Sequence, residues 1–164
     1  MKILLIGATG NISTDCADLL YRQGHQVTAL TRGYSPVPPE YGSIKVDRKD
    51  KSSMLNALKD IDTDIVINFL GYDVQELETD FAVFRDRIRQ YIFISTAMVY
   101  AKPHRFLPIT ESHPRGKPYS EYARKKYDRE GWLAEHLKTY MFPSTIVRPS
   151  HTYSNKWLPN PVSS

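Results

Sequence analysis

Several features that would place a chain in a special class are missing here. The only cysteine is Cys16, so no disulfide can form within the chain, and the sequence fits a reducing compartment. No apolar run approaches membrane-spanning length, and no leader precedes the first strand-like segment, so we expect a cytoplasmic protein. Internal repeats and low-complexity tracts are also missing. The composition is that of a globular chain of 164 residues, long enough for one domain with a hydrophobic core.

Common site motifs are missing as well. The sequence has no G-x-x-x-x-G-K-[ST] phosphate loop and no G-x-S-x-G nucleophile elbow. The histidines show no metal-ligand spacing, so we predict no metal site; they are His25, His104, His113, His136 and His151. The formal charge of +4 suits an anionic ligand such as a nucleotide but is weak evidence for nucleic acid, which we do not expect as a partner. The basic clusters at 45–51 and 124–129 are interpreted as solvated faces.

Strand-like and helix-like segments alternate along the chain, which indicates a parallel α/β sheet. The expected strands are 3–6, 27–30, 44–46, 64–70, 91–95 and 144–147, and the expected helices are 11–23, 51–59, 76–90 and 119–138. Six strands with crossover helices predict a Rossmann-type, doubly wound sheet with helices on both faces and the strand order 3-2-1-4-5-6. Ligands then bind at the carboxyl ends of strands one and four, where the winding direction changes.

A glycine turn joins the first strand to the first helix. Gly7 and Gly10 permit a tight turn and a close backbone approach, and the helix that begins near Asn11 offers free N–H groups to a pyrophosphate. We therefore predict cofactor contacts at the turn and at the end of strand four, from Gly7, Thr9, Gly10, Asn11, Ile12, Leu70 and Gly71. The alternative is a strand–turn–helix without a ligand, since a third glycine is missing and Ser13 stands in its place.

Three residues that could carry chemistry fall on the same predicted edge. Thr96 follows the fifth strand, and Tyr122 and Lys126 stand four apart on the long helix, so they share a face. A lysine ammonium beside a tyrosine favours the phenolate, which makes the tyrosine a general acid and base near neutral pH. The hydroxyl of Thr96 could hold the substrate oxygen. The alternative for the Tyr–Lys pair is a solvated helix face.

The end of the second strand bears on the choice of nicotinamide cofactor. An acidic residue there would bind the ribose 2′-hydroxyl and repel a 2′-phosphate, but the chain has Thr31 and Arg32 instead. Because an arginine can pair with a phosphate, we predict NADP in preference to NAD. The alternative is that Arg32 points into water.

Five motifs, taken together and in order, resemble those of a known family. They are Gly7-Ala8-Thr9-Gly10, Asp47, Ser95-Thr96-Ala97-Met98-Val99-Tyr100, Tyr122-Ala123-Arg124-Lys125-Lys126 and Ile146-Val147-Arg148-Pro149. The chain resembles the extended short-chain dehydrogenase/reductases, specifically the NAD-dependent epimerase/dehydratase group, over essentially its whole length. The resemblance implies that Thr96 is the hydroxyl partner, Tyr122 the acid/base and Lys126 its pKa tuner and ribose ligand. It also implies Asp47, with Arg48, near the adenine, and Pro149, Ser150 and His151 on the nicotinamide or substrate side.

The resemblance also shapes what we expect of domains and function. Family members carry a second, substrate-binding domain after the Arg-Pro strand, so we expect a dinucleotide-binding domain over 1–150 and a tail or the start of a truncated domain over 151–164. The function expected is an oxidoreductase, epimerase or dehydratase acting on a nucleotide-sugar-like or other carbonyl or alcohol substrate. Two alternatives stay open: a regulatory or RNA-binding protein on the same fold, and a cofactor-binding remnant without activity. A helix stripe from Trp132 to Phe142 would allow a homodimer, although core packing is the preferred interpretation.

Overall fold

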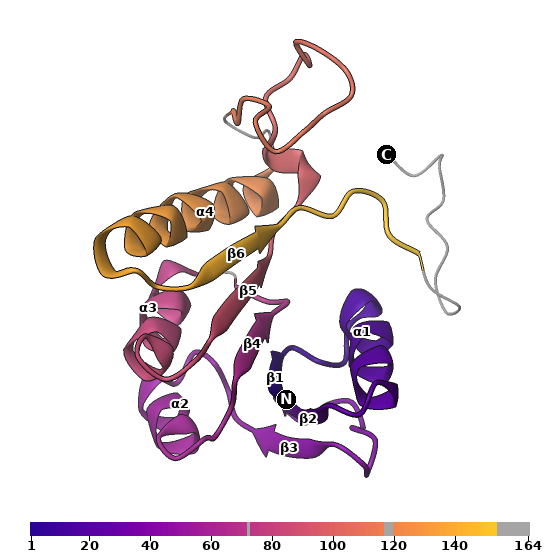
Figure 1. The fold of residues 1–164 in the computed structure, drawn as a ribbon, viewed down its shortest axis with the longest axis vertical. Helices are drawn as coiled ribbons and strands as arrows, with labels where there is room; N and C mark the ends of the chain where they lie inside the picture. Colours follow the sequence, from indigo (N-terminus) through magenta and orange to yellow (C-terminus); the bar gives the residue numbers. More distant parts are fainter. Residues whose placement is uncertain (72, 117–119, 154–164) are drawn as a thin grey trace.

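Six parallel strands form the centre of the molecule in the order β3-β2-β1-β4-β5-β6 (Figure 1). They are β1 (Lys2–Ile6), β2 (Gln26–Thr31), β3 (Gly42–Lys45), β4 (Ile65–Asn68), β5 (Gln90–Ile94) and β6 (Ser144–Val147). The computed structural model describes residues 1–71, 73–116 and 120–153. The strand order is the predicted one, and the winding direction changes between β1 and β4. The carboxyl ends of these two strands are therefore where the fold leaves room for a ligand.

Helices cover both faces of the sheet, as predicted. They are α1 (Asn11–Arg22), α2 (Lys51–Leu58), α3 (Val74–Phe84) and α4 (Glu121–Tyr140), and Figure 1 shows α1 on one side and the other three on the opposite side. Alternate residues of β1 serve the two faces, because Ile3 and Leu5 pack with Ala17 of α1, whereas Leu4 and Ile6 belong to the core under the other helices. Burial on both faces explains the continuous apolar run of this strand.

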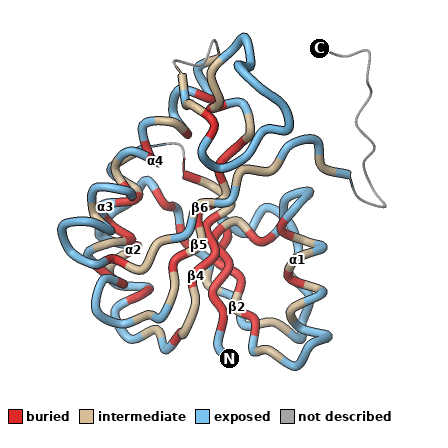
Figure 2. The backbone as a smooth tube through the Cα atoms, turned by 45° about the horizontal axis from the view of Figure 1, so that its top comes forward, coloured by how far each residue is buried: buried red, intermediate tan, exposed pale blue. Residues whose placement is uncertain are grey.

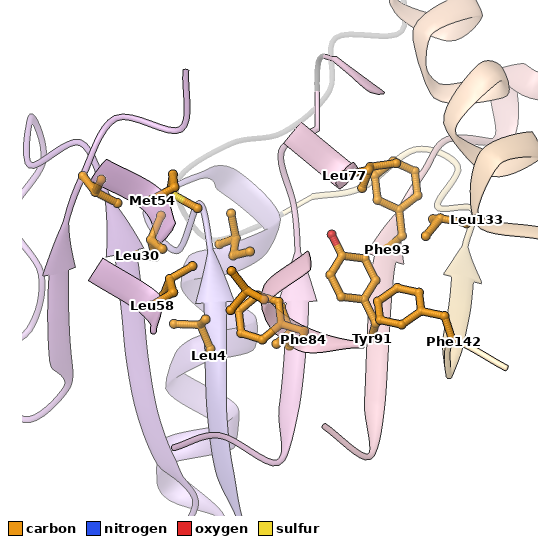
Figure 3. Close-up of a cluster of buried hydrophobic side chains, with 14 residues drawn as sticks. Leu4, Leu30, Met54, Leu58, Leu77, Phe84, Tyr91, Phe93, Leu133 and Phe142 are labelled. Carbon is orange, nitrogen blue, oxygen red and sulfur yellow. The ribbon is translucent and has the colours of Figure 1, made fainter. Parts of the chain in front are cut away.

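The larger core lies between the sheet and helices α2, α3 and α4 (Figure 3). Tyr91 and Phe93 of β5 are buried there beside Phe142, and Leu133 of α4 closes the cluster. Figure 2 shows the same pattern in the backbone, with buried strands in the middle and exposed helix faces outside. Leu133 and Phe142 are therefore core residues and Trp132 packs against them, as the preferred interpretation of that stripe predicted, but Leu137 of the same stripe is exposed.

Several predicted bounds differ from the structure, and one short element was missed. The helix predicted over 76–90 is α3, which begins earlier, where the Asp73 carboxylate accepts the N–H of Gln75 at 3.3 Å, and ends at Phe84. It ends early because the chain has to turn into β5, and Arg89 donates its N–H to the carbonyl of Asp64 at 2.8 Å. Strand β4 ends at Asn68, two residues before the predicted end. A short 3-10 helix, η1 (Ala97–Val99), was not predicted.

Two other predictions, about membrane-spanning segments and about the end of the chain, are tested only in part by the described residues. Within the described residues, no helix is long and apolar enough to cross a membrane. Most of the segment predicted as a tail or a further domain, residues 154–164, lies outside the described part of the chain.

Candidate active site

The turn between β1 and α1 accepts only glycine at its first position. Gly7 has a φ of 84°, which L side chains rarely adopt, and a Cβ there would lie 2.5 Å from Cγ of Leu70. Its N–H donates to the carbonyl of Leu30 at 3.0 Å and so ties the turn to β2. Gly10 is the N-cap of α1, whose first N–H groups and positive dipole end lie at the carboxyl edge of the sheet. Both glycines therefore lie where an anionic cofactor group would approach the backbone.

Ser13 is accommodated at the place where a third glycine was missing. The side chain is buried, and its Oγ accepts the N–H of Gly10 at 2.8 Å. The same hydroxyl donates to the carbonyl of Gly10 at 3.3 Å. Ser13 therefore holds the N-cap in place, and it occupies the Gly10 N–H that a phosphate would otherwise use.

One cleft brings together side chains from distant parts of the sequence. Its cavity of about 420 Å³ lies between the glycine turn, the end of β5, the start of α4 and the segment after β6. The predicted residues that line it are Gly7, Gly10, Asn11, Ile12, Leu70, Thr96, Tyr122, Pro149 and Ser150. Ser13, Phe69, Ile94, Ser95 and Thr152 also line it and were not predicted. Each of these five lies within two positions of a predicted residue, which is the one signal that could have found them.

A second cavity adjoins the first over the same turn. It measures about 280 Å³ and is lined by Gly7, Gly10 and Leu70 together with Thr9, Arg32, Asp47 and Arg48. Arg32 is exposed, and its guanidinium carbon lies 4.9 Å from the centre of the Tyr34 ring. Two cavities that meet over a glycine turn fit an elongated dinucleotide whose pyrophosphate lies on the turn.

Arg48, for which the resemblance implied a place near the adenine together with Asp47, lines the second cavity but has its guanidinium turned into the protein. The side chain is 7% exposed, and Nη1 and Nη2 each donate to a carboxylate oxygen of Asp80 on α3, both at 3.0 Å. This guanidinium is held inside the protein by an ion pair. Asp47 itself is exposed, and its Oδ1 accepts the N–H of Lys49 at 3.0 Å.

Lys126 lies under the cleft and is not among the residues that line it. The side chain is 2% exposed, and its Nζ donates to the carbonyls of Leu70 and Ile94, each at 2.7 Å. Burial, followed by the nearby charge of Arg129, lowers the pKa of Lys126 to about 7. Its Nζ lies 6.0 Å from the ring centre of Tyr122, close enough for the ammonium to act on the phenol electrostatically.

Thr96 and Tyr122 present their polar groups differently. Thr96 is buried, and its Oγ1 accepts the N–H of Met98 at 3.3 Å, which caps η1 and leaves the hydroxyl proton to donate elsewhere. Tyr122 is 45% exposed on the first turn of α4. The structure thus brings a buried hydroxyl and an accessible phenol to one cleft, with an ammonium near the phenol.

A buried carboxylate that the sequence analysis missed anchors the segment that follows β6. Glu130 of α4 is fully buried, and it accepts hydrogen bonds from Arg148 Nη2 at 2.8 Å and Arg115 Nη1 at 2.9 Å. Arg148 also donates to the hydroxyl of Tyr100 at 3.2 Å. These bonds fix the Arg148-Pro149 corner, which lines the cleft. The following His151 is exposed and does not line this cavity.

A further prediction concerns Gly71. This residue is buried with a φ of 91°, and a Cβ there would lie 2.8 Å from the Phe93 ring, so packing against β5 alone explains the glycine.

Among residues 1–71, 73–116 and 120–153, no group of three or more His, Cys, Asp or Glu side chains could hold a metal ion.

Known proteins similar to this chain fall into two sets. Among curated sequences, the Chloroplast stem-loop binding protein of 41 kDa b from Arabidopsis thaliana is 31% identical over 116 residues, which is 62% of this chain and 30% of that protein. The UDP-glucose 4-epimerase of Drosophila melanogaster is 36% identical over 58 residues, which is 35% of this chain and 16% of that protein. The chain thus spans less than a third of the length of either relative.

Solved structures share the fold. The dTDP-glucose 4,6-dehydratase of Bacillus anthracis in complex with NAD superposes with a TM-score of 0.80 at 20% identity, over 94% of this chain and 56% of the other. The UDP-glucose 4-epimerase of Bifidobacterium longum in complex with NAD+ and UDP superposes with a TM-score of 0.78 at 22% identity, over 90% and 52%. The model of the NAD dependent epimerase/dehydratase family matches residues 3–162, and the chain belongs to that family.

Proposed function

We propose that this chain binds a nicotinamide dinucleotide across the glycine turn and uses Tyr122 as the general acid and base of an epimerase, dehydratase or reductase. The observation that carries the proposal is the single cleft lined by Gly7, Gly10, Thr96 and Tyr122. These residues come from the turn between β1 and α1, the segment after β5, and α4, and no local folding preference would gather them. Membership of the NAD dependent epimerase/dehydratase family supports the same assignment.

Each residue has a distinct part in the proposed chemistry. When bound, the nicotinamide supplies a reversible two-electron acceptor. The Tyr122 phenol exchanges a proton with the substrate oxygen, and the hydroxyl of Thr96 donates a hydrogen bond that holds that oxygen. The positive charge of Lys126 favours the phenolate. Pro149 and Ser150 line the substrate side of the cleft, and His151 remains a candidate contact outside it.

The substrate class follows from the relatives. The epimerases and the dehydratase that share this fold are named for UDP-glucose and dTDP-glucose. We therefore propose a nucleotide sugar, or a related carbonyl or alcohol, as the substrate of the whole protein.

Replacement of Tyr122 by phenylalanine tests the catalytic assignment. The variant keeps the ring but loses the proton that moves, so we expect turnover of UDP-glucose or dTDP-glucose to fall by at least about 100-fold. The affinity for NADH should change by no more than about twofold, since the phenol does not carry the cofactor's binding energy. The measurement is a pair of assays, fluorescence titration of NADH and product analysis by chromatography. Unchanged turnover in the phenylalanine variant would refute the role of Tyr122.

We also propose that the chain binds NADPH more tightly than NADH. Arg32 is exposed at the end of β2 and lines the cavity that also contains Asp47, and its guanidinium can pair with a 2′-phosphate. No acidic side chain follows β2 to repel that phosphate.

Titration with both nucleotides tests this preference. We expect NADPH to bind about tenfold more tightly than NADH, and Arg32→Ala to remove the difference. Arg89→Ala is the matched control. Arg89 is also exposed, but it precedes β5 and so lies at the amino ends of the strands, away from the cavities at their carboxyl ends. Tighter binding of NADH to the native chain, or an equal effect of both alanine variants, would exclude a phosphate site at Arg32.

A second candidate function rests on one observation. The Arabidopsis relative, which matches more of this chain than the Drosophila epimerase does, is named as a stem-loop binding protein. The alternative is therefore a protein of the same fold that binds a nucleic-acid stem-loop. A salt-dependent gel shift with a stem-loop RNA tests it.

A further inference from the structure

The residue Asn68 ends β4 at the point where the winding of the sheet changes, and its side chain is fully buried. All of its hydrogen-bonding groups are used. Nδ2 donates to Asp80 Oδ2 at 3.0 Å and to the Tyr91 hydroxyl at 2.7 Å, and Oδ1 accepts the N–H of Leu70 at 2.9 Å. This last bond is a turn of the Asx type, which bends the chain as it leaves the strand.

The two partners of Asn68 Nδ2, Asp80 and Tyr91, are themselves held in place by hydrogen bonds. Asp80 is 1% exposed and is bound through both of its oxygens by Arg48. The Tyr91 hydroxyl donates to Asp80 at 2.5 Å, and burial together with the Asp80 charge raises the pKa of Tyr91, so this donor stays protonated. Because every partner is buried and hydrogen-bonded, the amide of Asn68 has one stable orientation.

The Oδ1 atom of Asn68 is connected to Lys126, the lysine of the proposed site, through residue Leu70. The Leu70 N–H is bound by Asn68, and the Leu70 carbonyl accepts the Lys126 Nζ at 2.7 Å. Leu70 lies beyond the end of β4, so it is outside the regular ladder between β4 and β1. The Asn68 side chain therefore holds the peptide between Phe69 and Leu70, and this peptide directs the backbone that carries the Leu70 carbonyl.

We propose that Asn68 is a positioning residue, which fixes the peptide between Phe69 and Leu70, so that the next carbonyl, that of Leu70, sets the place of the Lys126 ammonium under Tyr122. The inference rests on the proposed function in so far as that function uses Lys126. The proposal also gives a reason for the inward orientation of Arg48, which follows the predicted adenine contact Asp47. Arg48 holds Asp80, and Asp80 orients the amide of Asn68.

Titration of Lys126 by NMR, with carbon-13 at the lysine Cε and Lys126→Arg to assign the signal, tests this inference without cofactor or substrate. The charged groups that act on Lys126 are Arg129 and Glu130 of its own helix and Glu76 of α3, and none of them is altered. In Asn68→Ala the N–H of Leu70 loses its acceptor and the Leu70 carbonyl is no longer held in place, so we expect the pKa of Lys126 to fall by about one unit further, because the ammonium loses one of the two carbonyls that stabilise its charged form. Asn68→Ser should restore the native value, because a serine hydroxyl can accept the same N–H two residues on.

Tyr91→Phe is the matched control. It removes a buried hydrogen bond from the same network and lowers stability, but it leaves the bond between Asn68 and Leu70, so the titration of Lys126 should stay native. If Asn68→Ala does not fold, Asn68→Val, which keeps more volume at a strand end, takes its place. An unshifted Lys126 in the folded Asn68 variant, or an equal shift in Tyr91→Phe, overturns the positioning role alone. Full turnover in Tyr122→Phe would instead refute the proposed function and leave this result intact.

Discussion

Lys126 shows how much a single buried group can change the chemistry of a site. An ammonium that is 2% exposed and bound to two carbonyls has lost most of its hydration. Burial and Arg129 both disfavour the charged form, so its pKa falls to about 7. The lysine can therefore be charged or neutral near physiological pH, and its charge is what acts on Tyr122.

The lowered pKa predicts a pH dependence of stability. In the unfolded chain Lys126 titrates near 10.5, so above about pH 7 the unfolded state binds more protons than the folded state. The free energy of unfolding should therefore rise between pH 7 and pH 9, by roughly 2 kcal/mol from this residue. Urea denaturation at the two pH values measures the change. Lys126→Met keeps a long side chain without the titrating group, so its free energy of unfolding should rise by roughly 2 kcal/mol less than that of the native protein over the same pH range. Equal changes in both proteins would mean that the lysine keeps its ordinary pKa.

The elements of this fold differ in how far local sequence determines them. The apolar strands were predicted well, and β6 has the predicted bounds, because burial on both faces of a parallel sheet leaves a continuous hydrophobic run. The glycine turn was predictable for the same kind of reason, since Gly7 satisfies a backbone requirement that no other residue meets. Prediction of the strand order followed from general rules of connection.

The prediction of a solvated basic face on α4 was wrong in part, because Arg124 and Lys125 are exposed as predicted but the surroundings of the other two cations come from other segments. Lys126 and Arg129 belong to a basic cluster interpreted as solvated, yet they are buried at 2% and 1% exposure. Arg48, in the other basic cluster, is buried as well, with Asp80 as its partner. These partners are distant in sequence, so spacing along one helix carries no signal of them. The same holds for Glu130, whose arginines come from the loop after η1 and from the end of β6.

At the scale of the whole molecule, the net positive charge is small. The chain carries a formal charge of +4. Among the described residues, the buried charged side chains are Arg48, Asp80, Lys126, Arg129 and Glu130, so burial removes cations and anions in similar numbers. The surface is left with a small excess of positive charge, which gives limited long-range attraction for a polyanion.

This charge balance leads to a prediction that separates the two candidate functions. A protein that holds a stem-loop mainly through phosphate contacts loses affinity steeply between about 50 mM and about 200 mM salt. We expect this chain to shift a stem-loop RNA weakly at the lower salt and not at all at the higher, while NADH or NADPH still binds. A gel shift at both salt concentrations, repeated with saturating dinucleotide, measures this. If the shift persists at about 200 mM salt and the dinucleotide abolishes it, the cleft over Gly7 and Gly10 is a nucleic-acid site, because a surface of so little net charge could hold RNA at that salt only through specific contacts.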